Sequence, residues 1–128
     1  MTKIRDLKNF DFDEWLKLFK IYAAHYKTNL SKEGIQTTWN WLMTDTHPLT
    51  GIVAEKNSKL VGLLHFRAMP SPLRGKNIGF CDDIVVSPEN RGFGIAQMLF
   101  NEVKLRGKNE KWGVIRWITR DNNYKARH

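Results

Sequence analysis

The chain of 128 residues has a single cysteine, Cys81, so no disulfide can form between two of its own residues and no cysteine pair can hold zinc. The four histidines are scattered without the spacing of metal ligands, and the sequence therefore predicts no metal site. No stretch approaches the ~20 apolar residues of a membrane helix, and residues 1–10 lack the apolar core of a signal peptide. These absences predict a cytoplasmic protein with no membrane partner.

Acidic residues are also scarce, since 13 of them stand against 21 lysines and arginines and leave a net charge of +8. This excess fits either a basic solvated surface or an anionic partner, meaning a nucleic acid or a phosphorylated cofactor. The basic residues are spread along the chain without a run of five or more, which argues against a dedicated nucleic-acid arm. The length predicts one globular domain over residues 1–128.

The hydrophobic pattern predicts a mixed α/β domain, of the α+β kind with a mixed sheet. Apolar residues at helical spacing predict a first helix, with Asp11 as its N-cap and Glu14 as the reciprocal partner of a capping box. Ser31 is predicted to cap a second helix. The other predicted elements are strands over 2–7, 50–56, 59–69, 77–86 and 112–119, a loop over 69–76, a helix over 91–104 and a helix start at 121.

The segment that carries the clearest chemistry runs from Asp83 to Ala96. A buried apolar strand ends there, a turn with Pro88 follows, and a helix begins with two glycines. A helix N-terminus exposes unpaired N–H groups, and residues as small as Gly92 and Gly94 let a phosphate approach them. The pattern therefore suits a pyrophosphate held by backbone, although a glycine-rich helix start without a ligand would look the same. It is neither a Walker A loop nor a good dinucleotide fingerprint.

Two short motifs resemble those of the GNAT N-acetyltransferases. Arg91-Gly92-Phe93-Gly94-Ile95-Ala96 matches the family's Arg/Gln-x-x-Gly-x-Gly/Ala, and Asn123-Tyr124-Lys125-Ala126 is similar to its Asn-x-x-Ala. The finer pattern over 48–66, 82–84 and 117–119 resembles the subgroup with small histone and polyamine acetyltransferases. The resemblance implies a GNAT fold and an enzyme that transfers acetyl directly from acetyl-CoA to a primary amine in a ternary complex. The amine would be a polyamine, another small amine, or a protein lysine or N-terminus.

The resemblance also implies where acetyl-CoA binds, which is in a split between the fourth and fifth strands of the sheet. The pantetheine arm would bond to the backbone of the fourth strand, the pyrophosphate to the glycine-rich helix start, and Asn123 would lie near the thiol. The N–H group of Val86 would hold the oxyanion and so act as a catalytic group. The implied cofactor-binding residues are Ile84, Val85, Val86, Arg91, Gly92, Phe93, Gly94, Ile95, Ala96, Gln97 and Asn123.

Asp82 and Asp83 are the candidates for removing the proton of the amine. Neighbouring residues of a strand point to opposite faces, so the pattern predicts that Asp82 lies on one face and Asp83 on the other. An acidic residue matching Asp82 serves as general base, often through water, in several members of the family. The alternative is that one of the two only pairs with a nearby Lys or Arg. His65 is expected either to pack in the core or to line the substrate cleft.

Members of the family continue past the Asn-x-x-Ala helix with a tyrosine and two more strands, whereas only Arg127 and His128 follow Ala126 here. The resemblance therefore implies a GNAT domain over 1–128 that lacks its last strands. Weak or absent activity and a homodimer that covers the open sheet edge are the expected consequences. The alternative function is a non-catalytic acetyl-CoA-binding sensor or interaction module of the same fold.

Overall fold

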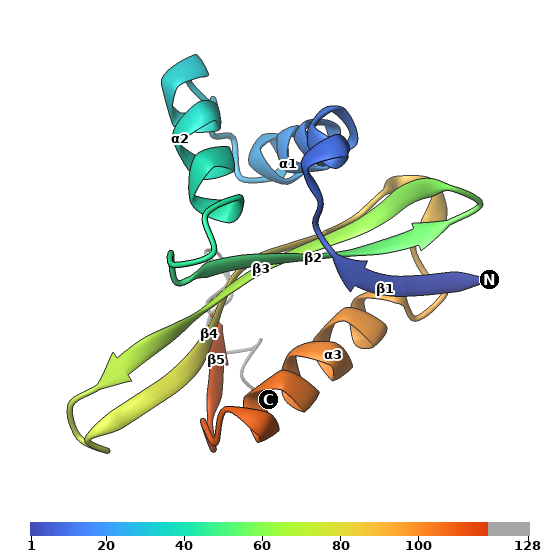
Figure 1. The fold of residues 1–128 in the computed structure, drawn as a ribbon. Helices are drawn as coiled ribbons and strands as arrows, with labels where there is room; N and C mark the ends of the chain where they lie inside the picture. The colour runs from blue at the N-terminus through green and yellow to red at the C-terminus, as the bar shows by residue number, and fades with distance from the viewer. Residues whose placement is uncertain (118–128) are drawn as a thin grey trace.

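One mixed sheet of five strands forms the centre of the molecule, and its strands follow one another in chain order (Figure 1). The computed structural model describes residues 1–117. The first four strands pair antiparallel, whereas β5 runs parallel to β4. The strands are β1 (Thr2–Asp6), β2 (Leu49–Lys56), β3 (Lys59–Ser71), β4 (Lys76–Val86) and β5 (Ile115–Trp117).

Helices cover both faces of this sheet, with α1 and α2 on one face and α3 on the other (Figure 1). This layering confirms the predicted mixed α/β class. In the described part of the chain no helix is long and apolar enough to cross a bilayer. The helices are α1 (Phe12–His25), α2 (Lys32–Leu42) and α3 (Ile95–Asn109), and the short 3₁₀ helices are η1 (Asn9–Asp11) and η2 (Pro88–Asn90).

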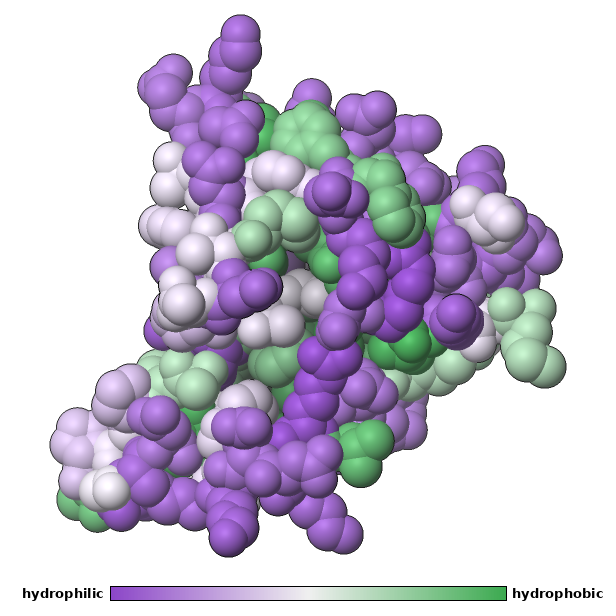
Figure 2. All heavy atoms as spheres, in the orientation of Figure 1, coloured by the Kyte–Doolittle hydropathy of each residue, from purple (hydrophilic) through white to green (hydrophobic). Residues whose placement is uncertain are grey.

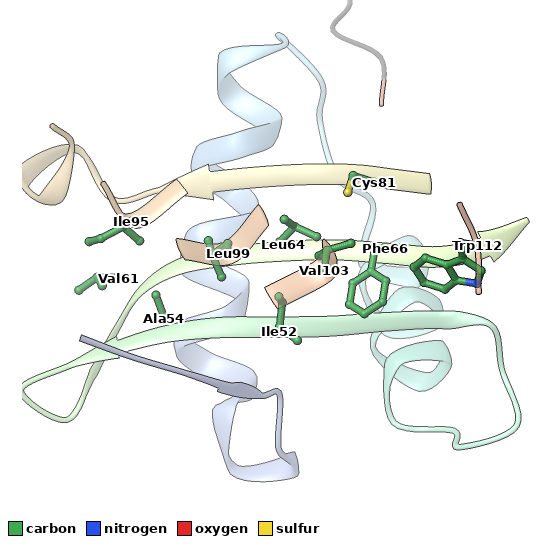
Figure 3. Packing of buried hydrophobic residues seen from close by; sticks show 10 residues of the cluster. All are labelled: Ile52, Ala54, Val61, Leu64, Phe66, Cys81, Ile95, Leu99, Val103 and Trp112. Atoms are coloured by element: carbon green, nitrogen blue, oxygen red, sulfur yellow. The ribbon is translucent and has the colours of Figure 1, made fainter. Parts of the chain in front are cut away.

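Each face of the sheet has its own hydrophobic cluster, because neighbouring residues of β2 and β3 alternate between the faces. Ile52 and Leu64 point toward α3, whereas Val53 and Leu63 point toward α1 and α2. On the face that Figure 2 shows, most atoms belong to hydrophilic residues, and apolar groups are visible in patches among them. The α3 cluster (Figure 3) consists of Ile52, Ala54, Val61, Leu64, Phe66, Cys81, Ile95, Leu99, Val103 and Trp112. The α1 cluster consists of Leu7, Trp15, Leu18, Trp39, Val53, Leu60, Leu63 and Val85.

The hairpin of β3 and β4 is longer than predicted. Residues 69–76 are not a loop, because the pairing continues to Ser71 opposite Lys76 and leaves only 72–75 as the turn. The N–H group of Gly75 donates to the carbonyl of Ser71 at 2.8 Å and closes this turn. Cross-strand pairing therefore outweighs the local turn composition of the segment.

The region after β4 also differs from the prediction of a helix over 91–104. Gly92 and Gly94 have φ angles of +85° and +78°, which a right-handed helix excludes, so α3 begins only at Ile95. Trp112 does not begin a strand, because β5 starts at Ile115, and its side chain is buried in the α3 cluster. A Cβ at Gly107 would lie 2.8 Å from the Trp112 ring, so the missing side chain makes room for the indole.

The predicted capping box at the start of α1 is wrong. The carboxylate of Asp11 accepts two hydrogen bonds from the Arg5 guanidinium, at 2.8 and 3.0 Å, and one from the N–H of Lys8 at 2.8 Å. The Glu14 carboxylate accepts instead from the N–H of Leu60 at 3.0 Å. Asp11 is only 2% exposed, and a buried carboxylate requires a cationic partner, which a helix N-terminus alone does not supply.

The predicted cap of α2 is confirmed, since the hydroxyl of Ser31 accepts the N–H of Gly34 at 2.9 Å. Trp39 is the buried residue of this helix, and Ile35 and Leu42 also pack against the α1 cluster.

Candidate functional site

A groove of about 430 Å³ opens where β4 ends, between α1 and the turn that precedes α3. It brings together most of the residues that the sequence predicts for cofactor binding. Its lining comes from β4 (Ile84, Val85, Val86), from the following turn and α3 (Asn90, Arg91, Gly92, Gly94, Ile95, Ala96), and from α1 (Ile21, Tyr22, His25, Tyr26).

The contribution of α1 to this groove was missed by sequence analysis. Tyr22 and Tyr26 belong to an apolar helical stripe, and such a stripe predicts only that the helix packs on a core. The two rings lie 5.0 Å apart between centroids, in contact with each other along the helix. Which part of the stripe covers the core and which part borders a groove depends on where α1 crosses β4.

One backbone edge of β4 faces the groove. Among the described residues, β5 pairs with β4 only at Gly79–Cys81. The N–H of Ser87 donates to the carbonyl of Val61 on β3 at 2.9 Å. Along an antiparallel strand, the N–H and C=O groups of successive residues point alternately to one edge of the strand and to the other. Because Ser87 points its N–H toward β3, the N–H and C=O groups of Val86 and Ile84 point away from β3.

The start of α3 presents further backbone N–H groups to the groove. The N–H of Met98 donates to the carbonyl of Gly94 at 3.1 Å, so the N–H groups of 95–97 precede the first hydrogen bond of the helix. No acidic residue stands in the first turn of α3, which leaves the positive end of the helix dipole uncompensated by a carboxylate. A Cβ on Gly92 or Gly94 would meet no atom within 4 Å, so open space adjoins both glycines.

Arg91 holds the turn against the end of β4. Its Nε donates to the carbonyl of Val86 at 3.1 Å, and both residues line the groove. The carbonyl of Val86 is thereby occupied, whereas its N–H remains directed toward the groove. The sequence pattern predicts Arg91 at the site but does not indicate that the side chain bonds to the protein backbone.

Of the predicted cofactor-binding residues, Phe93 and Gln97 do not line the groove, and Asn123 lies outside the described residues. Phe93 is 69% exposed, with the ammonium of Lys56 5.3 Å from its ring centroid. The Gln97 side chain donates to Asn101 one turn along the helix at 2.9 Å. Asn123, together with the predicted helix start at 121, lies outside the residues that the structure describes.

Asp82 is the extra residue of a β-bulge. In the pairing of β3 with β4, His65 is opposite Asp83 but Phe66 is opposite Cys81, which leaves Asp82 without a partner position. A bulge shifts the alternation of side chains by one residue. The prediction that the two aspartates point to opposite faces is therefore wrong.

Both carboxylates lie on the α1 side of the sheet. Asp83 Oδ2 is 2.8 Å from His65 Nδ1, and both carboxylate oxygens of Asp82 accept from Arg67 Nε, at 3.0 and 3.2 Å. His65 and Arg67 are two residues apart on β3 and share a face. That face is the one under α1, because the His65 ring lies against Trp15. The bulge thus gathers two acids and a cation at one place.

Tyr22 joins this acidic pair to the groove. Its hydroxyl donates to the backbone carbonyl of Asp82 at 3.3 Å and lies close enough to Asp83 for that carboxylate to act on its pKa. Burial raises the pKa of the Tyr22 phenol, and the negative charge of Asp83 raises this pKa further, so the phenol remains a donor. Burial likewise raises the pKa of Asp82 above its ordinary value, although the Arg67 guanidinium acts in the opposite direction.

His65 is completely buried and lies in the core, not in the groove lining. Besides its contact with Asp83, its Nε2 is 3.0 Å from the indole Nε1 of Trp15. The sequence separates Trp15 from His65 by 50 residues, and no local pattern predicts their contact. Burial also raises the pKa of the Cys81 thiol to about 12, which keeps it protonated and unsuited to covalent catalysis. Within residues 1–117 no cluster of His, Cys, Asp and Glu has the geometry of a metal site.

Comparison with known proteins gives one consistent result. The acetyltransferase (GNAT) family matches residues 12–128 of the chain. A D-amino-acid N-acetyltransferase of Saccharomyces cerevisiae is 22% identical over 125 residues, which cover 96% of this chain and 78% of that protein.

Solved structures of N-acetyltransferases share the fold. A ribosomal-protein-alanine N-acetyltransferase from Brucella melitensis biovar Abortus 2308 has a TM-score of 0.74 at 23% identity, over 100% of this chain and 88% of that one. The aminoglycoside N-acetyltransferase AAC(6')-Iy in complex with CoA has a TM-score of 0.83 at 17% identity, over 99% and 82% of the two chains. The predicted fold is therefore confirmed, and the chain belongs to the acetyltransferase (GNAT) family and is a GNAT-type N-acetyltransferase.

Proposed function

We propose that this enzyme binds acetyl-CoA in the groove at the end of β4 and transfers the acetyl group directly to a primary amine beside the bulge. The observation that carries the proposal is the groove itself, which joins the open edge of β4 to the unpaired N–H groups at the start of α3. Both features offer backbone donors to one extended, phosphate-bearing ligand. The neighbours of the same fold include a structure in complex with CoA.

In the proposed complex, the pantetheine arm lies along the edge of β4 and bonds to the backbone of Ile84 and Val86. The pyrophosphate lies against the turn with Gly92 and Gly94 and the N–H groups at the start of α3. The positive φ angles of both glycines allow the turn to present its backbone, and the absence of a Cβ keeps the approach open. Arg91 adds a positive charge, and its bond to Val86 holds the turn in place.

The proposed chemistry transfers one acetyl group and one proton. The ammonium of the acceptor first loses a proton, because its ordinary pKa near 10 leaves no lone pair at neutral pH. The amine nitrogen then bonds to the thioester carbon, whose oxygen takes the negative charge and accepts the N–H of Val86. The carbon–sulfur bond breaks and the CoA thiolate departs. The nitrogen, now bonded to the acetyl carbon, loses its second proton to solvent, and solvent returns one proton to the thiolate, so that the amide and the CoA thiol are formed.

The geometry favours Asp83 over Asp82 as the proton acceptor. Both carboxylate oxygens of Asp82 face Arg67, so the negative charge of Asp82 is paired with a cation. Asp83 gives one oxygen to the imidazole of His65, and the carboxylate adjoins Tyr22 on the groove lining. We propose that Asp83 takes the proton, directly or through one water, and that Asp82 contributes negative charge that attracts the ammonium.

The acceptor class is a cationic primary amine, because two carboxylates lie next to the groove. The names of the relatives above specify a D-amino acid, a ribosomal-protein alanine and an aminoglycoside as acceptors, all of which carry amines. A panel with one member of each class and a polyamine, assayed by release of free CoA, would identify the preferred acceptor. Absence of CoA release with every amine would contradict the enzymatic function.

Cofactor binding has a matched control within the chain. Gly94 and Gly75 both have positive φ, and a Cβ on either meets no atom within 4 Å, but only Gly94 lines the groove. Gly94→Val and Gly75→Val therefore introduce similar backbone strain. Titration calorimetry with acetyl-CoA is expected to give a Kd at least about tenfold weaker for Gly94→Val, or about 1.4 kcal/mol, and an unchanged Kd for Gly75→Val. Equal affinities in the two variants would contradict the assigned phosphate site.

A further inference from the structure

The imidazole of His65 lies between one donor and one carboxylate, and these partners decide where its proton sits. Its Nε2 is 3.0 Å from Trp15 Nε1, and its Nδ1 is 2.8 Å from Asp83 Oδ2. An indole N–H only donates, so Nε2 must accept and carry no hydrogen. Nδ1 then holds the single proton and donates it to Asp83. The arrangement specifies a neutral imidazole of the Nδ1–H form beside an ionised carboxylate.

The surroundings of His65 reinforce this state. The ring is completely buried, and the edge-to-face ring of Phe19 on α1 lies 5.1 Å from it between centroids. The ionisable groups around it are Asp83 and Asp82 on β4, Arg67 on β3 and Tyr22 on α1. Adding a second proton at Nε2 would break the bond to Trp15 and place two N–H donors against each other, which costs free energy in a buried site.

We infer that His65 is a positioning residue for acetyl transfer: Trp15 locks it as the neutral Nδ1–H form, and in that form it holds the Asp83 carboxylate ionised and oriented toward the amine. A doubly protonated imidazole would instead neutralise the charge of Asp83 and weaken it as a proton acceptor. This inference rests on the proposed function, because it gives His65 a role in the step assigned to Asp83. The inference gives a role to the buried pair of Trp15 and His65, neither of which lines the groove or is exposed to solvent.

The protonation state of His65 can be tested without any substrate. Nitrogen-15 spectra of the imidazole at neutral pH are expected to show a protonated Nδ1 and an unprotonated Nε2 in the wild-type protein. In Trp15→Phe, Nε2 loses the N–H group that it accepts, and its nitrogen-15 resonance is expected to move away from the wild-type position. Trp39→Phe is the matched control, because Trp39 is a neighbouring buried indole of the same cluster whose ring lies 4.9 Å from that of Trp15.

The positioning role is tested by turnover with the preferred amine. His65→Leu removes the donor to Asp83 and is expected to lower kcat about 10²-fold, the size of effect that a misplaced reacting group produces. The Kd for acetyl-CoA should not change, because His65 does not line the groove. His65→Asn keeps an amide donor close to the position of Nδ1 and is expected to retain more turnover than His65→Leu. Trp15→Phe, which removes the donor to His65, is expected to lower kcat more than Trp39→Phe does.

The outcomes separate this inference from the proposed function. A wild-type His65 that carries its proton on Nε2, or on both nitrogens, overturns the inference whatever the activity. Equal kcat in wild type and His65→Leu overturns the positioning role while leaving the acetyltransferase function intact. A wild-type enzyme that releases no CoA with any amine overturns the proposed function, and the positioning role fails with it.

Discussion

The two faces of the sheet are both closely packed, but they are packed in different ways. In the described part of the chain, the cluster on the α3 face consists of aliphatic residues, Phe66, Trp112 and Cys81, with no buried charge among them (Figure 3). The α1 face combines apolar residues with His65, Asp82 and Asp83, whose positions are set by hydrogen bonds. The α3 face therefore stabilises the sheet through apolar burial, while the α1 face combines its own apolar cluster with polar groups at the bulge.

The two kinds of packing respond differently to substitution. An apolar cluster tolerates exchange of similar volumes and stabilises through the area it buries. A buried polar group requires a partner of fixed geometry and loses its function when one partner is removed. Substitutions on the α3 face should thus change stability without altering the chemistry, and those at the bulge should do the opposite.

The largest expected effect concerns the bulge. Asp83→Asn keeps an oxygen that accepts from His65 but cannot take a proton, so turnover with an amine is expected to fall about 10²–10⁴-fold. The free energy of unfolding and the acetyl-CoA affinity should change little. Asp82→Asn is the comparison, and steady-state kinetics should show a smaller loss. A larger loss in Asp82→Asn would assign the proton to Asp82 instead.

The second effect concerns the α3 face. Leu99 is completely buried in the α3 cluster and does not line the groove. Leu99→Ala leaves a cavity and is expected to lower the free energy of unfolding by about 2–5 kcal/mol, measured by urea denaturation. Turnover per folded molecule should stay the same. A selective loss of kcat with unchanged stability would contradict the division between the faces.

The third effect concerns pH. Burial raises the pKa of Asp11, but hydrogen bonds from Arg5 and the Lys8 N–H lower it more, so that it lies below the ordinary 3.8. As the pH falls, Asp11 is therefore protonated in the unfolded chain at a higher pH than in the folded protein. The free energy of unfolding decreases as the pH drops from about 3.8 through the pKa that Asp11 has in the folded protein. Asp11→Asn should cost about 2 kcal/mol at neutral pH, and its difference from wild type should shrink in acid. A constant difference, measured by denaturation at several pH values, would contradict this pKa.

The smallest effect lies at the edge of the α1 face. Ser31→Ala removes the acceptor for the N–H of Gly34 and is expected to cost about 1 kcal/mol, whereas Ser31→Asp should restore most of the loss. Thermal unfolding measures both changes. Loss of amine turnover in Ser31→Ala would show that α2 is coupled to the bulge, which the division between the faces does not predict.

The sequence predicted the strands and helices well where one pattern acted alone. Alternating or continuous apolar runs predicted β2 and most of β3 and β4, and the Ser31 cap predicted the start of α2. Predictions failed where a residue of another element competed with the local pattern. Asp11 pairs with Arg5 on β1, and the hairpin beyond Met69 extends because the opposite strand continues to pair.

The same distinction holds for the candidate site. The spacing of Gly92 and Gly94 after a buried strand led to the prediction of a phosphate-binding turn, because such small residues have an effect that is local to the backbone. Both glycines line the groove, and phosphate binding there stays a prediction. The tertiary structure alone placed α1 along the groove, because helix position depends on packing.

What the sequence by itself determined is the set of elements, the family and the turn at the end of β4. What only the tertiary structure decided is the polar chemistry of the α1 face. A single unpaired residue in the β3–β4 ladder turned Asp82 to the side of Asp83, and α1 brought Trp15 to His65 across 50 residues. Strand alternation is a local rule that one bulge reverses, and hydrogen bonds between distant segments follow from packing that no local pattern records.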